Sequence, residues 1–255
     1  CSNVEVYLNG HRIFSGGRMS EPVTRNCYYP QLVTLPAALL QDKANLLDLQ
    51  VQGHSLPRVA SRSRAGGLSV VKIGPQAVLS AEHDLRLFWN VTAVQLANGV
   101  LAVLGCVMIG LGLMNRREAY LGHFGWLLLA WALLSSRLWW RDPPWDTGVM
   151  EFLFCTGYAP MVALAILFLL SYADLRSRLI ENALAMQWVL LPATLLLAGP
   201  GRLYLMASIW YAVLTAEAIA AIGLHLVMTW RRKRADFWLM ATLLGAVALI
   251  HLLEI

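Results

Sequence analysis

The sequence predicts an all-β sandwich, incomplete at its N-terminus, followed by an all-α polytopic bundle of membrane helices. The chain is 58% hydrophobic and 14% charged, with a mean hydropathy of +0.57, whereas a soluble domain carries about 25% charged residues. The shortage of charge lies almost wholly after residue 87, and residues 88–114 contain no ionisable side chain. Because about 20 apolar residues cross a bilayer core, this run divides a water-soluble domain, residues 1–86, from a membrane domain, residues 87–255.

The water-soluble domain shows short strands separated by turns. Residues 4–8 alternate apolar and polar side chains, meet Asn9-Gly10 and resume over residues 11–14. Asn-Gly between two such runs predicts a β-hairpin, because both turn residues take positive φ. Further strands are expected over residues 31–35, 45–51 and 68–73, with one turn of helix over residues 36–40. Short alternating strands with turn residues between them favour an antiparallel sandwich.

The membrane domain shows repeated apolar segments of spanning length. Proline makes the loop at Pro143-Pro144 non-helical, and Gly199-Pro200-Gly201 indicates a tight turn. Six transmembrane helices are predicted, over residues of about 88–114, 119–140, 149–173, 182–198, 203–230 and 237–255.

Basic residues between these segments predict the orientation in the membrane. The loops after the second and fourth helices hold Arg141 and Arg202, with Arg137 close by, whereas the loops after the odd-numbered helices are richer in charge. Short cytoplasmic loops carry an excess of Lys and Arg, which places the sandwich outside the cytoplasm and explains the net charge of +5 without a nucleic-acid partner. The topology-determining residues are Arg116, Arg117, Arg176, Arg178, Arg231, Arg232, Lys233 and Arg234.

Four neighbouring residues of the sandwich are candidates for ligand binding. Tyr28 and Tyr29 could stack on the face of a sugar, with Arg25 or Asn26 beside them; alternatively the tyrosines are ordinary strand and rim residues. In an oxidising compartment Cys1 and Cys27 could form a disulfide, and the sequence leaves this pairing open.

Ionisable residues at bilayer depth are functional hypotheses by default. Glu217 lies near the middle of the fifth helix, where it could act as a proton-linked switch or ion ligand, or as a hydrogen-bonded carboxyl that joins helices. His225, His251 and His123 lack the spacing of a metal site, so they are interpreted as core or interface residues. The sequence shows no catalytic or cofactor motif, and the segment is therefore not expected to be an enzyme or to bind a cofactor or metal.

Two sets of motifs resemble known families. Tyr7-Leu8-Asn9-Gly10, Leu35-Pro36 with Leu39-Leu40, and residues 45–49 resemble the galactose-binding-like jelly roll. This sandwich, residues 66–75, the first apolar run and residues 115–124 are similar, in that order, to bacterial seven-transmembrane receptors with diverse intracellular signalling modules.

The resemblance implies a periplasmic sensor in the bacterial inner membrane. It would relay a signal to a histidine kinase or cyclic-dinucleotide output, usually as a homodimer. The ligand would be a small molecule, a carbohydrate among the candidates, or a protein. Because a seventh helix and an output module are missing from the sequence, we expect a piece of a longer receptor. Two alternatives remain open at this point: a transporter or channel that uses Glu217, and a membrane-tethered carbohydrate-binding protein.

Overall fold

The computed structural model describes residues 2–115, 118–175, 177–233 and 237–254. Its contacts divide the chain into two compact units, and the boundary between them does not coincide with the change of composition near residue 86. The first unit combines residues 1–100 with 133–155 and 198–205, and the second combines residues 101–132, 156–197 and 206–255. We call residues 2–75 the head; it shares its unit with the ends of several helices, and each unit is described here by itself.

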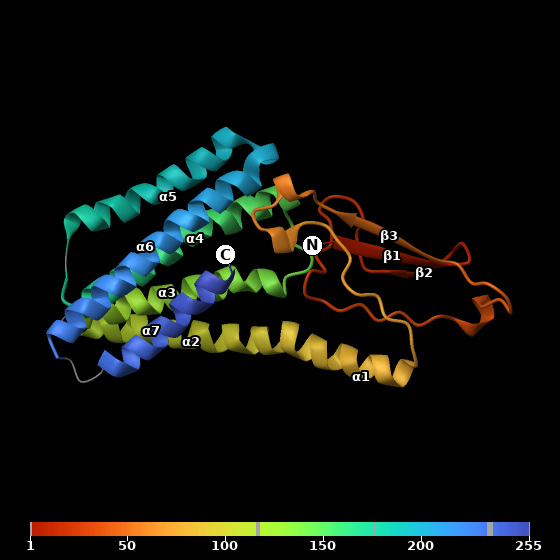
Figure 1. The fold of residues 1–255 in the computed structure, drawn as a ribbon, viewed down its shortest axis with the longest axis horizontal. Helices are drawn as coiled ribbons and strands as arrows, with labels where there is room; N and C mark the ends of the chain where they lie inside the picture. Colours follow the sequence, from red (N-terminus) through yellow and green to blue (C-terminus); the bar gives the residue numbers. More distant parts are fainter. Residues whose placement is uncertain (1, 116–117, 176, 234–236, 255) are drawn as a thin grey trace. The chain divides into compact units, whose positions relative to one another are not determined.

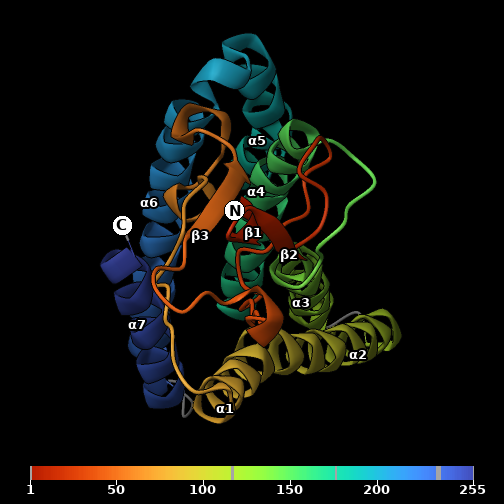
Figure 2. The same cartoon turned by 90° about the vertical axis from the view of Figure 1, so that its right-hand side faces the viewer.

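The head contains a three-stranded antiparallel sheet in the order β2-β1-β3 (Figure 2). Strand β1 (Ser2–Leu8) pairs with β2 (His11–Ser15) and with β3 (Leu47–Gly53). Asn9 and Gly10 adopt φ values of 51° and 84°, which confirms the predicted hairpin turn. Val6 lies opposite Leu49 on β3, and such cross-strand apolar pairs are what stabilise a sheet face.

Two predicted strands are wrong, and the head does not show a jelly roll. Residues 31–35 and 68–73 lie outside any strand, whereas the single helical turn is confirmed as the 3-10 helix Ala37–Leu39. Residues 31–35 are bracketed by Pro30 and Pro36, which offer no amide hydrogen to a ladder. In the segment 68–73, Val70 and Ile73 are exposed. Alternation in these segments therefore specified extended backbone, but it did not specify a pairing partner.

The first membrane helix begins earlier than predicted. Helix α1 (Gln76–Leu87) continues through the π-helical turn Phe88–Thr92 into α2 (Ala93–Met114), and the two run as one apolar helix of 39 residues (Figure 1). At 1.5 Å per residue this helix is about 58 Å long, longer than a bilayer core of roughly 30 Å. Its first part therefore extends beyond the lipid, beside the head.

The remaining predicted spans all form helices. Helix α3 is shorter than predicted because its last turn passes into the 3-10 helix Ser136–Leu138. Among the described residues, four helices are long and apolar enough to cross a membrane: Gln76–Met114, α4, α5 and a segment that contains α6. The bounds are α3 (Ala119–Ser135), α4 (Thr147–Tyr172), α5 (Arg178–Ala198), α6 (Leu203–Arg231) and α7 (Phe237–Glu254).

Within the second unit, α2 and α3 approach closely at two pairs of glycines. A Cβ atom built on Gly112 would lie 2.7 Å from the amide nitrogen of Gly122, and one on Gly125 would lie 2.6 Å from the carbonyl oxygen of Gly105. Small residues let membrane helices pack backbone to backbone. The core beside them is apolar and is built by α4, α5 and α6: Ala163, Ile166, Leu169, Leu170, Leu184 and Ala221.

Candidate functional site

A cavity of about 750 Å³ lies within the first unit, between the sheet and helix α1. Val4, Val6 and Leu49 form its sheet wall, and Leu79 on α1 faces the same space. The extended segments 26–35 and 63–74 supply the remaining walls, with both apolar and polar side chains. A partly apolar cavity of this size that also offers polar groups is the usual form of a small-molecule site.

Three of the four predicted ligand residues line this cavity: Asn26, Tyr28 and Tyr29. The Tyr29 hydroxyl donates a hydrogen bond of 2.6 Å to the carbonyl oxygen of Trp139, and burial raises the pKa of that phenol. The Asn90 side chain donates to the carbonyl oxygen of Tyr28. The cavity wall is therefore held at both tyrosines by the ends of membrane helices.

Arg141 connects this wall to the loop between α3 and α4. Its guanidinium lies 4.9 Å from the centre of the Tyr29 ring, donates to Asn26 Oδ1 at 3.1 Å, and also donates to the carbonyl oxygen of Gly16. Asp142, which lies in the same loop as Arg141, accepts at its Oδ1 a hydrogen bond of 2.6 Å from Thr24 Oγ1 in the head. Because Arg141 covers a face of Tyr29, that ring is a less open stacking platform than the sequence suggested.

Arg25, the fourth predicted ligand residue, is outside the cavity lining. Its guanidinium donates to Glu151 Oε1 at 3.1 Å and lies 5.8 Å from the centre of the Phe154 ring. Glu151 lies in the first turns of α4, and its Oε2 accepts from the amide of Ala60 at 2.9 Å and lies 3.0 Å from Arg64 Nη1. Arg25 is therefore placed to bind the head to α4 rather than to line the cavity, and its role as a ligand contact stays a prediction.

The side chains of Arg25, Arg64 and Glu151, which we call the Glu151 cluster, are almost completely buried. They are only 5%, 4% and 1% exposed, respectively. Burial lowers the pKa of Arg25, Glu151 opposes that change, and the positive charges of Arg64 and Arg137 add to it. One buried carboxylate is thus shared by two arginines, Arg25 and Arg64.

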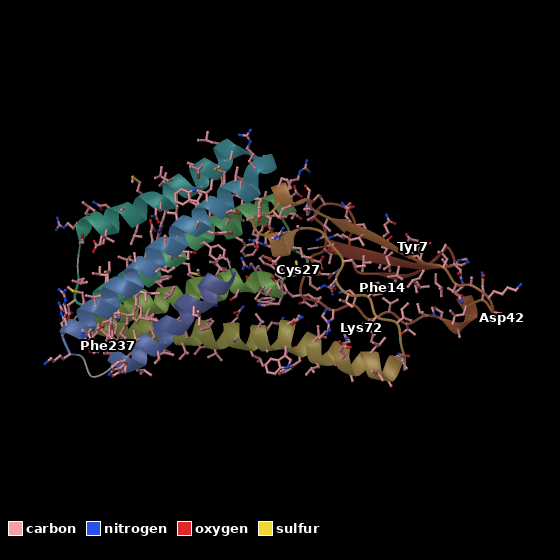
Figure 3. The ribbon with its side chains drawn as sticks, in the orientation of Figure 1. Tyr7, Phe14, Cys27, Asp42, Lys72 and Phe237 are labelled. Carbon is pink, nitrogen blue, oxygen red and sulfur yellow. The ribbon has the colours of Figure 1, made fainter. Side chains whose placement is uncertain are left out.

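Charged residues also stand at the mouth of the cavity on α1. Glu82 accepts hydrogen bonds from Lys72 Nζ at 2.6 Å and 2.8 Å and lies 2.7 Å from Arg86 Nη2. Figure 3 shows Lys72 on the extended segment that runs beside α1. The helix that enters the membrane is thus attached to the cavity wall by an exposed ion pair.

The intramembrane candidates lie in the second unit. Glu217 accepts a hydrogen bond from Gln187 Nε2 on α5 and lines a smaller cavity of about 260 Å³. His225 is fully buried, where its Nδ1 lies 3.0 Å from the carbonyl oxygen of Leu169, and His123 Nδ1 lies 3.2 Å from Ser171 Oγ. His251 belongs to α7, but its side chain lies outside the described part of the chain. The three described side chains, Glu217, His225 and His123, thus contact different partners.

The described topology-determining residues are exposed at helix ends: Arg178, Arg231, Arg232 and Lys233. Arg232 also donates to the carbonyl oxygen of Ala173 at 2.7 Å, beyond the C-terminus of α4, which satisfies an orphan carbonyl there. Arg116, Arg117, Arg176 and Arg234 lie outside the described residues.

Two further sequence questions concern cysteines and metals. Cys27 is disulfide-bonded; Cys1, which the sequence offered as its partner, lies outside the described residues. Across the described part of the chain, no group of three His, Cys, Asp or Glu side chains could hold a metal ion.

The fold and the cavity together define a membrane protein with a small β-sheet head on its first helices. Comparison of the chain with models of known families, with curated proteins and with solved structures finds no match. The function is therefore argued from the sites alone.

The residues that sequence reasoning missed are those that pair over long distances: Glu151, Arg64, Arg141 and Gln187. A signal was present for Glu151, because it is the one Asp, Glu, Lys, Arg or His in the apolar run 149–173, and such residues mark functional or structural sites. No local pattern announces that arginines 25 and 64 reach it.

Proposed function

We propose that this chain is the sensing part of a bacterial membrane receptor of the seven-transmembrane class. A signal received in the head cavity would be relayed to a cytoplasmic histidine kinase or cyclic-dinucleotide output. One observation carries the proposal: the helix Gln76–Met114 lines the cavity with its N-terminal turns and continues as an apolar span. A ligand in the cavity therefore touches the element that enters the lipid.

The contacts around the cavity provide two further routes to the membrane helices. Arg141 joins the Tyr29 side of the cavity to the α3–α4 loop, and the Glu151 cluster joins the head to the start of α4. A ligand shifts a conformational equilibrium only by its differential affinity for the two states. Residues that contact both the cavity and the helix ends are where such a difference can arise.

The proposed ligand is a small molecule, with carbohydrates as one class, or a protein segment. Asn26, Tyr28 and the polar groups on α1 supply hydrogen-bonding partners, and the sheet wall supplies apolar surface. The proposed setting is the inner membrane with the head in the periplasm, supported by the basic residues at one set of helix ends. A homodimer follows from the same resemblance to the receptor family.

The orientation can be tested with compartment reporters fused after residue 40 and after residue 232. We expect the two reporters to lie in opposite compartments, with residue 40 in the periplasm. A result with both positions in the same compartment would eliminate the receptor model.

The relay can be tested without knowing the ligand, by filling the cavity with a side chain. Leu49 lines the cavity, whereas Val51 on the same strand is exposed and does not line it. In a Cys106→Ser background, spin labels at residues 114 and 179 report the distance between helix ends of the second unit. We expect Leu49→Trp to shift that distance distribution and Val51→Trp to leave it unchanged. Unchanged distributions for both variants would contradict the relay.

The two rival functions meet different observations. A tethered binding protein needs a head independent of the helices, yet the contacts place the sheet in one unit with residues 133–155. The transporter alternative rests on Glu217 and its cavity. Loss of flux in vesicles with Glu217→Gln, with an unchanged label distance in the test above, would favour transport.

A further inference from the structure

A second cavity lies within the helical unit. It has a volume of about 260 Å³ and is lined by α4, α5 and α6. Its walls are apolar except for Gln187 and Glu217, and small alanines such as Ala183 and Ala220 leave the space between the larger side chains. Both polar residues lie near the middle of their helices, Arg178–Ala198 and Leu203–Arg231, so the pair lies close to the bilayer midplane.

The polar pair leaves two acceptor atoms unused. Gln187 Nε2 donates to Glu217 Oε1, while Glu217 Oε2 and Gln187 Oε1 are buried with no hydrogen-bond partner among the described residues. A buried acceptor without a donor destabilises the fold, and in hydrocarbon there is little water to replace the donor. The chemistry missing from this cavity is therefore a hydrogen-bond donor.

We propose that this cavity binds a membrane-dissolved amphiphile whose apolar body carries a donating O–H group, an alcohol or a phenol. The O–H would donate to Glu217 Oε2 or Gln187 Oε1, and the body would pack against the alanine, leucine and isoleucine walls. Ala183, Ala220 and Leu224 at its edge are exposed on apolar helices, so the ligand can enter sideways from the lipid.

Two other occupants fit the cavity less well. A divalent cation such as Ca²⁺ takes about six to eight oxygen ligands, and only two polar side chains line this space. Water alone occupies about 30 Å³ per molecule, so filling the cavity with water would wet a wall that is almost entirely apolar. In a third arrangement Glu217 is protonated and its Oε2–H donates to Gln187 Oε1, which closes a reciprocal acid–amide pair and engages both atoms without any ligand.

The test uses the full chain in nanodiscs and two probes of matched shape, 4-pentylphenol and 4-pentylanisole. The anisole carries a methyl ether in place of the O–H group and cannot donate a hydrogen bond. Both probes partition into lipid, so a difference between them reports the donated hydrogen bond. The readout is the shift in thermal unfolding temperature as each probe is titrated. We expect the phenol to bind at least about tenfold more tightly than the ether, because only the phenol can donate a hydrogen bond to a buried acceptor that otherwise has no partner.

Variants separate the proposed site from other phenol sites. The double variant Glu217→Leu/Gln187→Leu should lose the preference for phenol, and Ala220→Leu, which fills the cavity while keeping both polar residues, should lose phenol binding. Thr242→Val on α7 is the control, since its hydroxyl already donates to its own helix; it should retain the preference. Equal affinity for the two probes would overturn the proposal and favour the closed acid–amide pair. A preference that survives Ala220→Leu would place the phenol elsewhere and would also overturn it.

Discussion

Each of the two units holds a glutamate whose carboxylate has a buried oxygen, and the two carboxylates have different partners. In the first unit Glu151 faces Arg25, Arg64 and the amide of Ala60, so both of its oxygens are engaged. In the second unit Glu217 accepts from Gln187 alone, and its other oxygen has no partner among the described residues. The first carboxylate is tied into the protein, whereas the second keeps an acceptor available.

This difference separates a structural role from a binding role. Desolvated charges persist when they are paired and hydrogen-bonded, and the partners of Glu151 come from the head, so the cluster fixes the head on the start of α4. The partner of Glu217 comes from a neighbouring membrane helix, and Glu217 lines a cavity. Removing each glutamate should therefore have different consequences.

The largest effect is expected for Glu151→Gln. The variant removes the buried carboxylate charge to which Arg25 donates and which Arg64 faces, and breaking a buried pair in this way costs about 3–5 kcal/mol. Denaturant unfolding in detergent, monitored by a fluorophore in the head, would measure the loss. Glu181→Gln, an exposed residue on α5, is the matched control and should change stability little. A loss below about 1 kcal/mol would mean that the cluster does not hold the head.

The next effect concerns the glycine contacts that hold α2 against α3. Gly112→Val would place side-chain atoms against the backbone of Gly122, and such overpacking costs about 1–3 kcal/mol. Gly110, on the same helix, has nothing within 4 Å of a Cβ position, so Gly110→Val carries the same change of helix propensity without the clash. We expect only the first variant to lower the unfolding temperature of the helical unit. Equal effects of the two substitutions would show that α2 and α3 do not meet at Gly112.

Local features of the sequence predicted the local features of the fold. Asn9-Gly10 specified the hairpin because few pairs of neighbouring residues can both adopt positive φ. The apolar runs specified the helices. The start of the first long helix was missed because α1 carries Glu82, Asp84 and Arg86. A hydropathy pattern marks the apolar part of a helix, and here the helix begins before its apolar part.

The site was predicted only as far as neighbours along the chain allow. Asn26, Tyr28 and Tyr29 do line the cavity. Arg25 instead donates to Glu151, which lies more than one hundred residues away in the sequence. The sequence identified Arg141 only as a loop residue that bears on membrane orientation, and not as a contact of the cavity wall. Pairings of this kind depend on how distant segments meet, and periodicity carries no information about them. The acceptor left free on Glu217 was likewise invisible, because the composition of α5 and α6 does not say which side chains face each other.

A smaller effect is expected at Glu217 itself, measured as a double-mutant cycle. Gln187→Leu removes the donor from Glu217 and should cost about 1–2 kcal/mol. Glu217→Leu/Gln187→Leu replaces both polar groups by apolar ones and should be close to neutral, so the two single effects should not add. The measurement is the free energy of unfolding in lipid-like detergent without added amphiphile. Additive losses would mean that the two side chains do not share a hydrogen bond.

The smallest effect should be confined to the head. Tyr7 donates to Glu5 Oε2 at 2.8 Å, and this hydrogen bond, with help from Arg12 and Ser15, lowers the pKa of Glu5 below its ordinary value of 4.5. A carboxyl whose pKa is lower when folded stabilises the fold above its ordinary pKa, and that contribution is lost as pH falls through the lowered value. Tyr7→Phe should therefore leave stability near pH 7 slightly reduced and move the acid unfolding of the sheet to higher pH. Tyr204→Phe, a tyrosine outside the sheet, should leave the acid midpoint unchanged, and an equal shift in both variants would show that Glu5 does not set it.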